Sequence, residues 1–317
     1  MSCCAPSRNL STAKRVPETW ELTGDDARQT LASTGTGRLA RDAFTRLRAA
    51  DGFSHARSLA FATGLVLLQG IIAVVGLASA LGKGRASDVI VGTIRATVPG
   101  PAGHLLTQAV DQAHSAGASH RFLPLLVGLV GAIVTGCTFM GQLERGLNRI
   151  YGVERDRPTL RKYGLALLLT LSAGLLATMA FAAVALGGSI GSSLGDDLPG
   201  RVWNWIRWPL ALVLMMTAVA LLFRWSPRRR QPAWSWLAFG ATVSVGLWAI
   251  STLTLSLFFR TSTQFGETYG PLAGIVALQI WSLLSCIALL FGGALGAQLE
   301  AVRAGAAAPK TSGQGGR

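Results

Sequence analysis

Long uncharged stretches alternate with short charged ones along most of this chain. The stretch from Phe122 to Leu143 has no charged residue in 22 positions, and the stretch from Tyr163 to Gly195 has none in 33. In a helix, 22 residues at 1.5 Å each cover about 30 Å, which is the thickness of a bilayer hydrocarbon core. A helix of a soluble protein carries polar residues along one face, whereas these stretches are apolar on every face. The pattern therefore predicts helices that cross a membrane.

The same criterion predicts an all-α, polytopic membrane protein with six transmembrane helices. The spans are expected at residues 58–82, 122–143, 163–189, 208–223, 233–259 and 271–299. The fourth span has only 16 uncharged residues, but Arg207 and Arg224 at its ends can reach toward water and lengthen it. Trp203, Trp205 and Trp208 cluster at its start, as in the aromatic belt of a membrane interface.

The residues outside the predicted six-span bundle (58–300) are polar or short. Residues 1–36 and 301–317 lack hydrophobic periodicity and are predicted to be disordered tails. From 37 to 57, apolar residues recur on one helical face with arginines between them. This pattern is typical of an amphipathic helix lying at the membrane surface, with its arginines near anionic headgroups. A solvated helix packed on the cytoplasmic loops explains the pattern equally well.

The distribution of positive charge predicts the orientation. Of the 29 Lys and Arg residues, 22 lie in the two termini and the two loops expected on the same side, and 7 lie in the opposite loops. Loops rich in Lys and Arg stay in the cytoplasm, so both termini are predicted to be cytoplasmic.

Composition agrees with a membrane protein. Half of the 317 residues are hydrophobic, 14% are charged, and the mean hydropathy is +0.43. The net charge is +14, but the Lys and Arg residues flank the apolar spans and form no separate basic domain. This distribution argues against nucleic acid as a partner. The expected partners are the lipid bilayer and anionic lipid headgroups at the cytoplasmic face. The sequence does not reveal the oligomeric state.

Three glutamines inside predicted spans are candidate functional residues: Gln69, Gln142 and Gln279. An unpaired amide in hydrocarbon costs several kcal/mol, so these side chains are expected to face other helices. Gln69 and Gln279 fall at similar depths and are predicted to line one polar seam without necessarily touching. The seam would be a path for a solute or headgroup in a transporter, and a clamp between helices in a scaffold.

A second candidate set lies where the second span meets a charged connector, at the inner mouth of the bundle. It comprises Glu144, Arg145, Asn148, Arg149 and Tyr151. Polar residues at such depths often mark a pathway, but hydrogen bonding between helices and topology anchoring account for each of them singly.

Four stretches carry a resemblance to a known family. They are Arg57 with SLAFA (58–62), LERGLNRIYGV (143–153), ETYGPLAGIVALQIWSLL (267–284) and FGGALGAQLE (291–300). In this order and on six spans they resemble the YihY/virulence factor BrkB family of bacterial inner-membrane proteins, over roughly residues 38–303. The resemblance implies a multi-pass protein of the bacterial inner membrane.

The chain departs from the family's usual pattern at several positions. Ala62 stands where the family usually has Tyr, and Gln69 where it has a Pro in mid-span. Leu295 and Gly296 stand where it often has Glu and then Asn. The chain therefore resembles a divergent member, and a mechanism that depends on a Glu at that position is not carried over.

The resemblance implies a non-enzymatic protein, since family members are associated with envelope integrity and resistance to host killing. Such a bundle would support the envelope by moving a lipid or an anionic metabolite. The alternative is a helical membrane scaffold that binds a partner protein, because Gly187-x-x-x-Gly191 and Gly292-x-x-x-Gly296 permit close helix contact. A ligand-sized cavity lined by the glutamines would favour the first function, and a solid core the second.

Catalytic residues, cofactors and metals are not expected. Acyl or phosphoryl chemistry needs a nucleophile beside a base, or a metal, and no such group recurs on one side of the membrane. Asp111, His114 and His120 share the longest loop (83–121), but their spacing matches no tight metal motif. The ribonuclease label that the family has carried gets no support, because a metal-dependent nuclease needs several convergent Asp, Glu or His ligands.

The topology is testable with reporter fusions placed after residues 110, 155, 200, 230, 265 and 310. Because each predicted span reverses the side of the membrane, the reporters should alternate outside, inside, outside, inside, outside and inside. Paired alkaline phosphatase and green fluorescent protein fusions report the two sides. Two adjacent fusions that report the same side would remove a span and refute the layout.

Overall fold

The computed structural model describes residues 15–80, 91, 94, 98, 100–119, 122–154, 157–193, 198–262, 265, 269 and 272–306. The helices are α1 (Gly24–Thr34), α2 (Thr36–Ala49), α3 (Gly52–Ala80), α5 (Gly100–Ser119), α6 (Leu123–Tyr151), α7 (Thr159–Ser193), α8 (Leu198–Trp225), α9 (Trp234–Thr261) and α11 (Ala273–Arg303). Over these residues the secondary structure is all helical and contains no strand, as predicted.

Within the residues that the structure describes, six helices are long and apolar enough to cross a membrane, which confirms the six predicted spans. They are α3, α6, α7, α8, α9 and α11. The helices run past the uncharged stretches at most ends; α8, for example, has 28 residues where the sequence showed 16 uncharged ones. The charged connector is likewise helical at its start, because α6 continues to Tyr151 and ends only at Gly152, whose φ of 71° is left-handed.

The outward faces of these helices carry large apolar side chains, as a lipid-facing surface requires. Exposed examples recur at helical spacing and include Leu126, Val130 and Val134 on α6, Leu168, Leu171 and Leu175 on α7, and Ile250, Leu253 and Leu257 on α9. A soluble protein would rarely expose apolar area on this scale.

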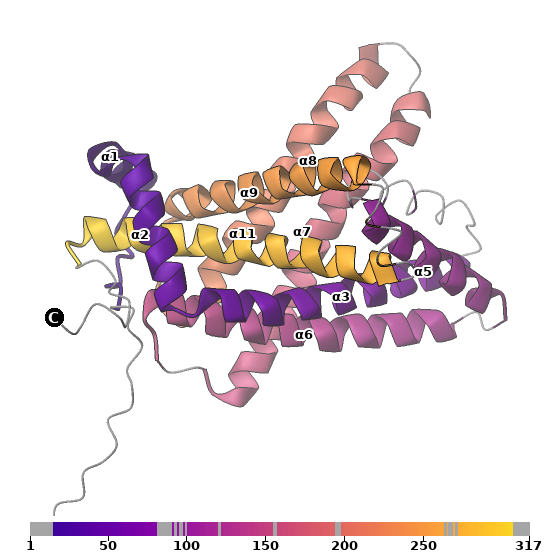
Figure 1. The fold of residues 1–317 in the computed structure, drawn as a ribbon, viewed down its shortest axis with the longest axis horizontal. Coiled ribbons are helices and arrows are strands. Elements are labelled where there is room, and N and C mark those ends of the chain that lie inside the picture. The colour runs from indigo at the N-terminus through magenta and orange to yellow at the C-terminus, as the bar shows by residue number, and fades with distance from the viewer. Residues whose placement is uncertain are drawn as a thin grey trace, which may run out of the picture.

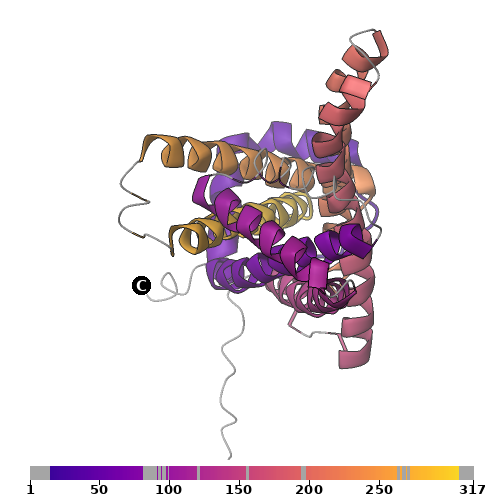
Figure 2. The same ribbon diagram turned by 90° about the vertical axis from the view of Figure 1, so that its right-hand side faces the viewer.

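Helix α11 is the central element of the bundle. It contacts α2, α3, α5, α6 and α9, and Figure 1 shows it between α9 on one side and α3 with α6 on the other. Figures 1 and 2 show α7 and α8 running side by side across the bundle, with their far ends projecting beyond the other helices. Both ends of the described chain lie at the same end of the bundle, called here the terminal end.

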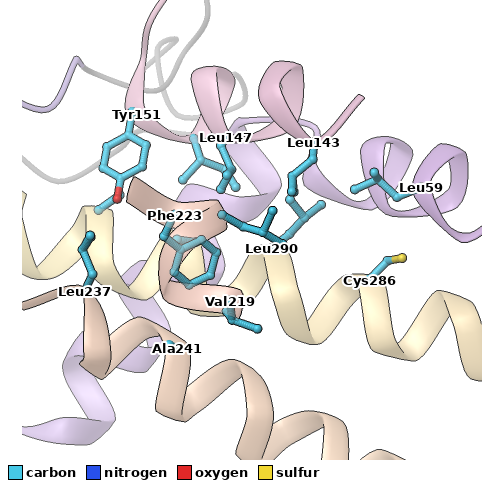
Figure 3. Packing of buried hydrophobic residues seen from close by; sticks show 14 of the residues in the cluster. Leu59, Leu143, Leu147, Tyr151, Val219, Phe223, Leu237, Ala241, Cys286 and Leu290 are labelled. Carbon is cyan, nitrogen blue, oxygen red and sulfur yellow. The ribbon is translucent and has the colours of Figure 1, made fainter. Parts of the chain in front are cut away.

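The main hydrophobic core lies toward the terminal end, and Figure 3 labels residues that five of the spanning helices contribute to it. These are Leu59 of α3, Leu143, Leu147 and Tyr151 of α6, Val219 and Phe223 of α8, Leu237 and Ala241 of α9, and Cys286 and Leu290 of α11. Leu59, Leu143, Leu147 and Leu290 are fully buried. This packing fixes the ends of α6, α8, α9 and α11 relative to one another.

The N-terminal region differs from the prediction. Residues 1–36 were expected to be a disordered tail, but the structure has helix α1 within this range, and Thr23 with Asp26 forms a capping box at its start. Residues 1–14, like 307–317 of the predicted C-terminal tail, lie outside the described residues. Order at 15–34 depends on contacts with residues far along the chain, which local sequence cannot reveal.

The predicted amphipathic segment, residues 37–57, forms two helices. Helix α2 ends at Ala49, the chain turns at Asp51 with a φ of 54°, and α3 begins at Gly52. Helix α2 contacts α11, and its apolar positions Leu39, Ala43 and Leu47 are buried. Its apolar face therefore packs on protein, chiefly on the spanning helix α11, whereas the alternative had placed a solvated helix on the cytoplasmic loops.

Glycines allow α9 and α11 to touch along their backbones. A Cβ on Gly240 would lie 2.8 Å from the carbonyl oxygen of Gly292, and a Cβ on Gly292 would collide with Ser244 and with the Gly240 carbonyl. Gly292 belongs to one of the small-residue pairs that were expected to permit close helix contact. In the structure it serves the contact between two helices of the same chain.

The Gly292→Ala variant should be less stable by about 1–3 kcal/mol, because its methyl group has no space against the α9 backbone. The matched control is Gly174→Ala on α7, where no atom lies within 4 Å of the new Cβ. The control should stay within about 1 kcal/mol of wild type, since alanine favours the helix. Denaturant unfolding in detergent measures both; equal stability of the two variants would refute the close α9–α11 contact.

Candidate functional site

Gln69 lies at the interface between α3 and α6. Its side-chain carbonyl occupies the space that a Cβ on Gly131 of α6 would fill. Its Oε1 is buried and has no hydrogen-bond partner among the described residues. Gly128, one turn away on α6, lies against the backbone of Ala73, so the two helices approach closely here. Gln69 therefore faces protein rather than lipid.

Gln279 lies against another part of α3. Its Nε2 is 3.4 Å from the position that a Cβ on Gly64 would take. Gly64 and Gln69 are five residues apart, which is about 140° around a helix, so the two glutamines contact different faces of α3. Gln142 is half-buried on α6, near its end. The structure does not bring these three residues into one cavity among those described, and the polar seam stays a prediction.

The inner-mouth residues occupy the last turns of α6 and divide between its two faces. Glu144, Asn148 and Tyr151 are buried, whereas Arg145 and Arg149 are exposed. This division follows from their spacing, because positions three and four apart share a helical face. The structure therefore gives the two groups different roles.

The buried inner-mouth residues hold the loop between α8 and α9. Glu144 pairs with Arg157 at 3.1 Å, and Arg157 also donates hydrogen bonds to the carbonyls of Trp225, Ser226 and Pro227. The backbone N–H of Arg228 donates to Asn148 Oδ1 at 2.8 Å. The end of α6 is thus joined to this loop by both charged and neutral contacts.

The next residue of that loop forms a buried ion pair. Arg229 lies 2.7 Å from Glu300 of α11, and their side chains are 1% and 0% exposed. The guanidinium also lies over the ring of Tyr151, 4.5 Å from its centroid. A buried pair of this kind repays its desolvation only when further hydrogen bonds satisfy both partners.

The N-terminal segment provides such hydrogen bonds. Thr19 donates its hydroxyl proton to Glu300 Oε2 at 2.7 Å, and Arg229 donates to the carbonyl of Pro17 at 2.9 Å. Beside them the backbone N–H of Val16 donates to the Tyr151 carbonyl at 3.0 Å. Residues 16–19 therefore close the terminal end of the bundle over the ion pair.

Arg46 of α2 is the second buried arginine of this region. It is fully buried, and it donates to Gln298 Oε1 at 2.8 Å and to the Ile150 carbonyl at 3.3 Å. Burial lowers the pKa of Arg46 to about 10, so the side chain stays charged at neutral pH. We call Arg46, Tyr151, Arg229, Gln298 and Glu300 the buried charge cluster.

Helix α1 is fastened to the same end by a more exposed contact. Arg303 of α11 donates to Asp26 Oδ1 at 2.8 Å. The pKa of Asp26 is lowered, chiefly by the hydrogen bond from the backbone N–H of Thr23 and then by the Thr23 hydroxyl.

Sequence reasoning missed most of the buried charge cluster. Arg46 was one of the arginines of the predicted amphipathic segment, 37–57, and Arg229 entered only through the count of positive charge that predicts the orientation. One signal was present: Glu300 is an acid at the end of a long apolar span, in a chain with 15 acidic and 29 basic residues. An acid at such a position needs a partner, and the pairing itself could not be inferred from spacing.

Away from the cluster, an apolar cavity lies between α7, α8 and α9. It has a volume of about 460 Å³ and is lined by residues such as Phe181, Trp208, Leu212, Met215 and Trp248. A smaller cavity of about 150 Å³ shares Phe181, Met215, Val245 and Trp248 with it and reaches α11 at Ser285 and Leu289. We treat the two as one space, the α7–α9 cavity, because four residues line both.

Metal ligands do not gather in the described part of the chain: no three His, Cys, Asp or Glu residues come together there. His104 and Asp111 lie exposed on α5. The side chain of His114 and all of His120 fall outside the described residues, so their expected role as surface histidines is untested.

Comparisons with known proteins identify a matching family and several related sequences. A sequence profile described as Virulence factor BrkB matches residues 43–314. The ribonuclease-like protein YfkH of Bacillus subtilis is 26% identical over 266 residues, which cover 82% of this chain and 94% of that protein. No solved structure is detectably similar to this chain.

Two further relatives are described as membrane proteins. The UPF0761 membrane protein of Halorhodospira halophila is 26% identical over 52% of this chain and 36% of its own length. The UPF0761 membrane protein IL2447 of Idiomarina loihiensis is 24% identical over 55% of this chain and 61% of its own length. The matched region thus spans less than two thirds of these two relatives.

Removing the carboxylate of the ion pair should destabilise the protein strongly. Glu300→Ala leaves Arg229 buried without a counter-charge, and the expected loss is about 3–5 kcal/mol of unfolding free energy in detergent. The control is Asp25→Ala, whose side chain is 93% exposed and lies 3.7 Å from Arg28; its effect should be below about 1 kcal/mol. Similar losses in both variants would show that the Glu300 pair is not an essential contact.

Proposed function

The chain belongs to the virulence factor BrkB family of membrane proteins, and we propose that it acts without catalysis, by taking lipid acyl chains from the bilayer into the α7–α9 cavity. It is a multi-pass bacterial membrane protein with six apolar helices. The observation that carries the proposal is the cavity itself: about 460 Å³ lined by apolar and aromatic side chains of three spanning helices.

The surroundings of the cavity favour an acyl chain as its occupant. Trp208 and Leu212, which line it, are 57% and 50% exposed on the outside of α8, so the cavity wall is continuous with the lipid-facing surface. Space lined mainly by apolar groups is a poor site for water, which needs several polar partners. Hydrocarbon from the bilayer is the apolar material available to occupy this cavity.

An acyl chain as the occupant selects between the two cargoes expected from the family resemblance. Of the two candidates, a lipid or an anionic metabolite, an apolar cavity suits the lipid. A chain held between α7, α8 and α9 would be guided along the bundle, and moving lipid in this way would support envelope integrity. The glutamines, which were expected to line a cavity, have no part in this proposal.

A non-enzymatic role is also our proposal, despite the ribonuclease-like name of one relative. The two buried acids of the described chain, Glu144 and Glu300, each pair with an arginine. A nuclease that uses metal ions needs several carboxylates or imidazoles directed at one point. Paired carboxylates on different helices suit a structural role better.

We further propose that the terminal end of the bundle faces the cytoplasm, near anionic headgroups. The excess of Lys and Arg in the termini and in the loops on the same side supports this orientation. The alternative function, a scaffold for a partner protein, was expected to have a solid core. The α7–α9 cavity is not lined by the glutamines, as that comparison of functions required, so its size and apolar lining are what support lipid handling.

Filling the cavity tests the proposal. Ala211→Trp on α8 places an indole in the cavity, and photo-crosslinking to a phospholipid with a diazirine on its acyl chain should fall about tenfold, equivalent to about 1.4 kcal/mol of binding. Digestion and mass spectrometry should locate the wild-type crosslinks on α7, α8 and α9 around the cavity.

The matched control is Leu253→Trp on α9, an equally bulky change at a side chain that is 70% exposed to lipid. Its crosslinking should equal that of wild type. Equal labelling of the two variants, or wild-type crosslinks spread evenly over the lipid-facing helices, would contradict a specific acyl-chain site.

A further inference from the structure

A polar cavity of about 280 Å³ lies at the terminal end of the bundle. It is lined by His55 of α3, by Arg145, Asn148 and Arg149 of α6, and by Val153 and Glu154. None of these residues lines the α7–α9 cavity, and none belongs to the buried charge cluster. We call this space the arginine pocket.

The local structure places both arginines on one wall of the pocket. Arg145 and Arg149 are four residues apart on α6 and so lie one above the other on the same exposed face. Helix α6 ends directly before the left-handed Gly152, and the chain then turns so that Val153 and Glu154 form another side of the pocket.

The opposite wall is the first turn of α3. A Cβ on Gly146 would lie 3.4 Å from the His55 Cβ, so the glycine at this position lets α3 approach α6 closely. Asn148 is held in place, because its Oδ1 accepts the hydrogen bond from the backbone N–H of Arg228. The pocket walls are therefore fixed by packing between helices.

The charges of the pocket suit a phosphate group. Two arginines outnumber the one carboxylate, Glu154, and a guanidinium matches phosphate oxygens with two parallel hydrogen bonds. His55 lies in the first turn of α3, where the helix dipole adds partial positive charge. Glu154 can accept a hydrogen bond from a hydroxyl or amino group carried by the same ligand.

We propose that the arginine pocket binds one phosphate ester, with Arg145 and Arg149 as its direct ligands. The proposal goes beyond acyl-chain binding and stands independently of it, because the two cavities share no residue. Arg145 and Arg149 lie near the end of the span Leu125–Tyr151, and residues at the end of a span are expected close to the lipid headgroups. A phospholipid headgroup and a soluble phosphate ester can therefore both reach this site.

Two binding measurements on the full-length protein separate these sources. The first is calorimetry in detergent with glycerol 3-phosphate, and the second is native mass spectrometry with phosphatidylethanolamine. The variant Arg145→Gln/Arg149→Gln removes both ligands and should weaken the binding of whichever probe is bound by about tenfold or more. Both side chains are exposed, and an unchanged gel-filtration profile would show that the variant folds.

The matched control is Arg161→Gln/Arg57→Gln, which removes two exposed arginines that do not line the pocket and lie at the ends of other spans. Its binding should stay within about twofold of wild type, since loss of diffuse charge has a small effect. Binding of the soluble ester alone would identify a soluble ligand, and binding of the lipid alone a headgroup site. Equal loss in both double variants, or no binding of either probe by wild type, would overturn the proposal.

Failure of this proposal is distinguishable from failure of the proposed function. The cavity-filling variant Ala211→Trp should bind the phosphate probe as wild type does, because Ala211 lines only the α7–α9 cavity. Loss of phosphate binding in that variant would show that the two sites are not independent.

Discussion

The ion pair between Arg229 and Glu300 is the contact on which the terminal end of the bundle depends. It joins the α8–α9 loop to α11, and Tyr151 of α6 stacks on its guanidinium. Thr19 supplies a further hydrogen bond from the N-terminal segment. Charges removed from water need such additional partners, so the contacts from α6 and from the N-terminal segment help to stabilise the pair.

The two regions of the bundle are held by different forces, and this difference bears on function. At the terminal end, Arg229 pairs with Glu300 and Arg46 donates to Gln298, and separating such buried polar partners in a low-dielectric environment is expensive. Around the α7–α9 cavity the contacts are apolar, and lipid tails are as apolar as the side chains they would replace. Hydrocarbon can therefore enter between α7, α8 and α9 with little loss, while the charge cluster keeps the helices in register.

Hydropathy predicted the six spans because a bilayer imposes one length and one polarity on every crossing helix. It placed helix ends less well. The predicted span ended at Leu143, before the charged residues, yet α6 continues to Tyr151. Glu and Arg are good helix formers, so charge does not end a helix, and the buried Glu144 pairs with Arg157. The order of residues 15–34 and the faces of Gln69 and Gln279 depend on contacts between distant segments, which a single sequence does not encode locally.

The closing segment of α11 shows how a departure from a family pattern can be physically consistent. Gly296 stands where the family often has Asn, and it faces Tyr151, since a Cβ there would be in ordinary contact with the Tyr151 hydroxyl at 3.8 Å. A carboxylate is still present one turn later, as Glu300, where it pairs with Arg229. Because that carboxylate holds the N-terminal segment and the α8–α9 loop together, its role is to fix the bundle. The ion pair does not enter the walls of the two cavities in which we propose that ligands bind.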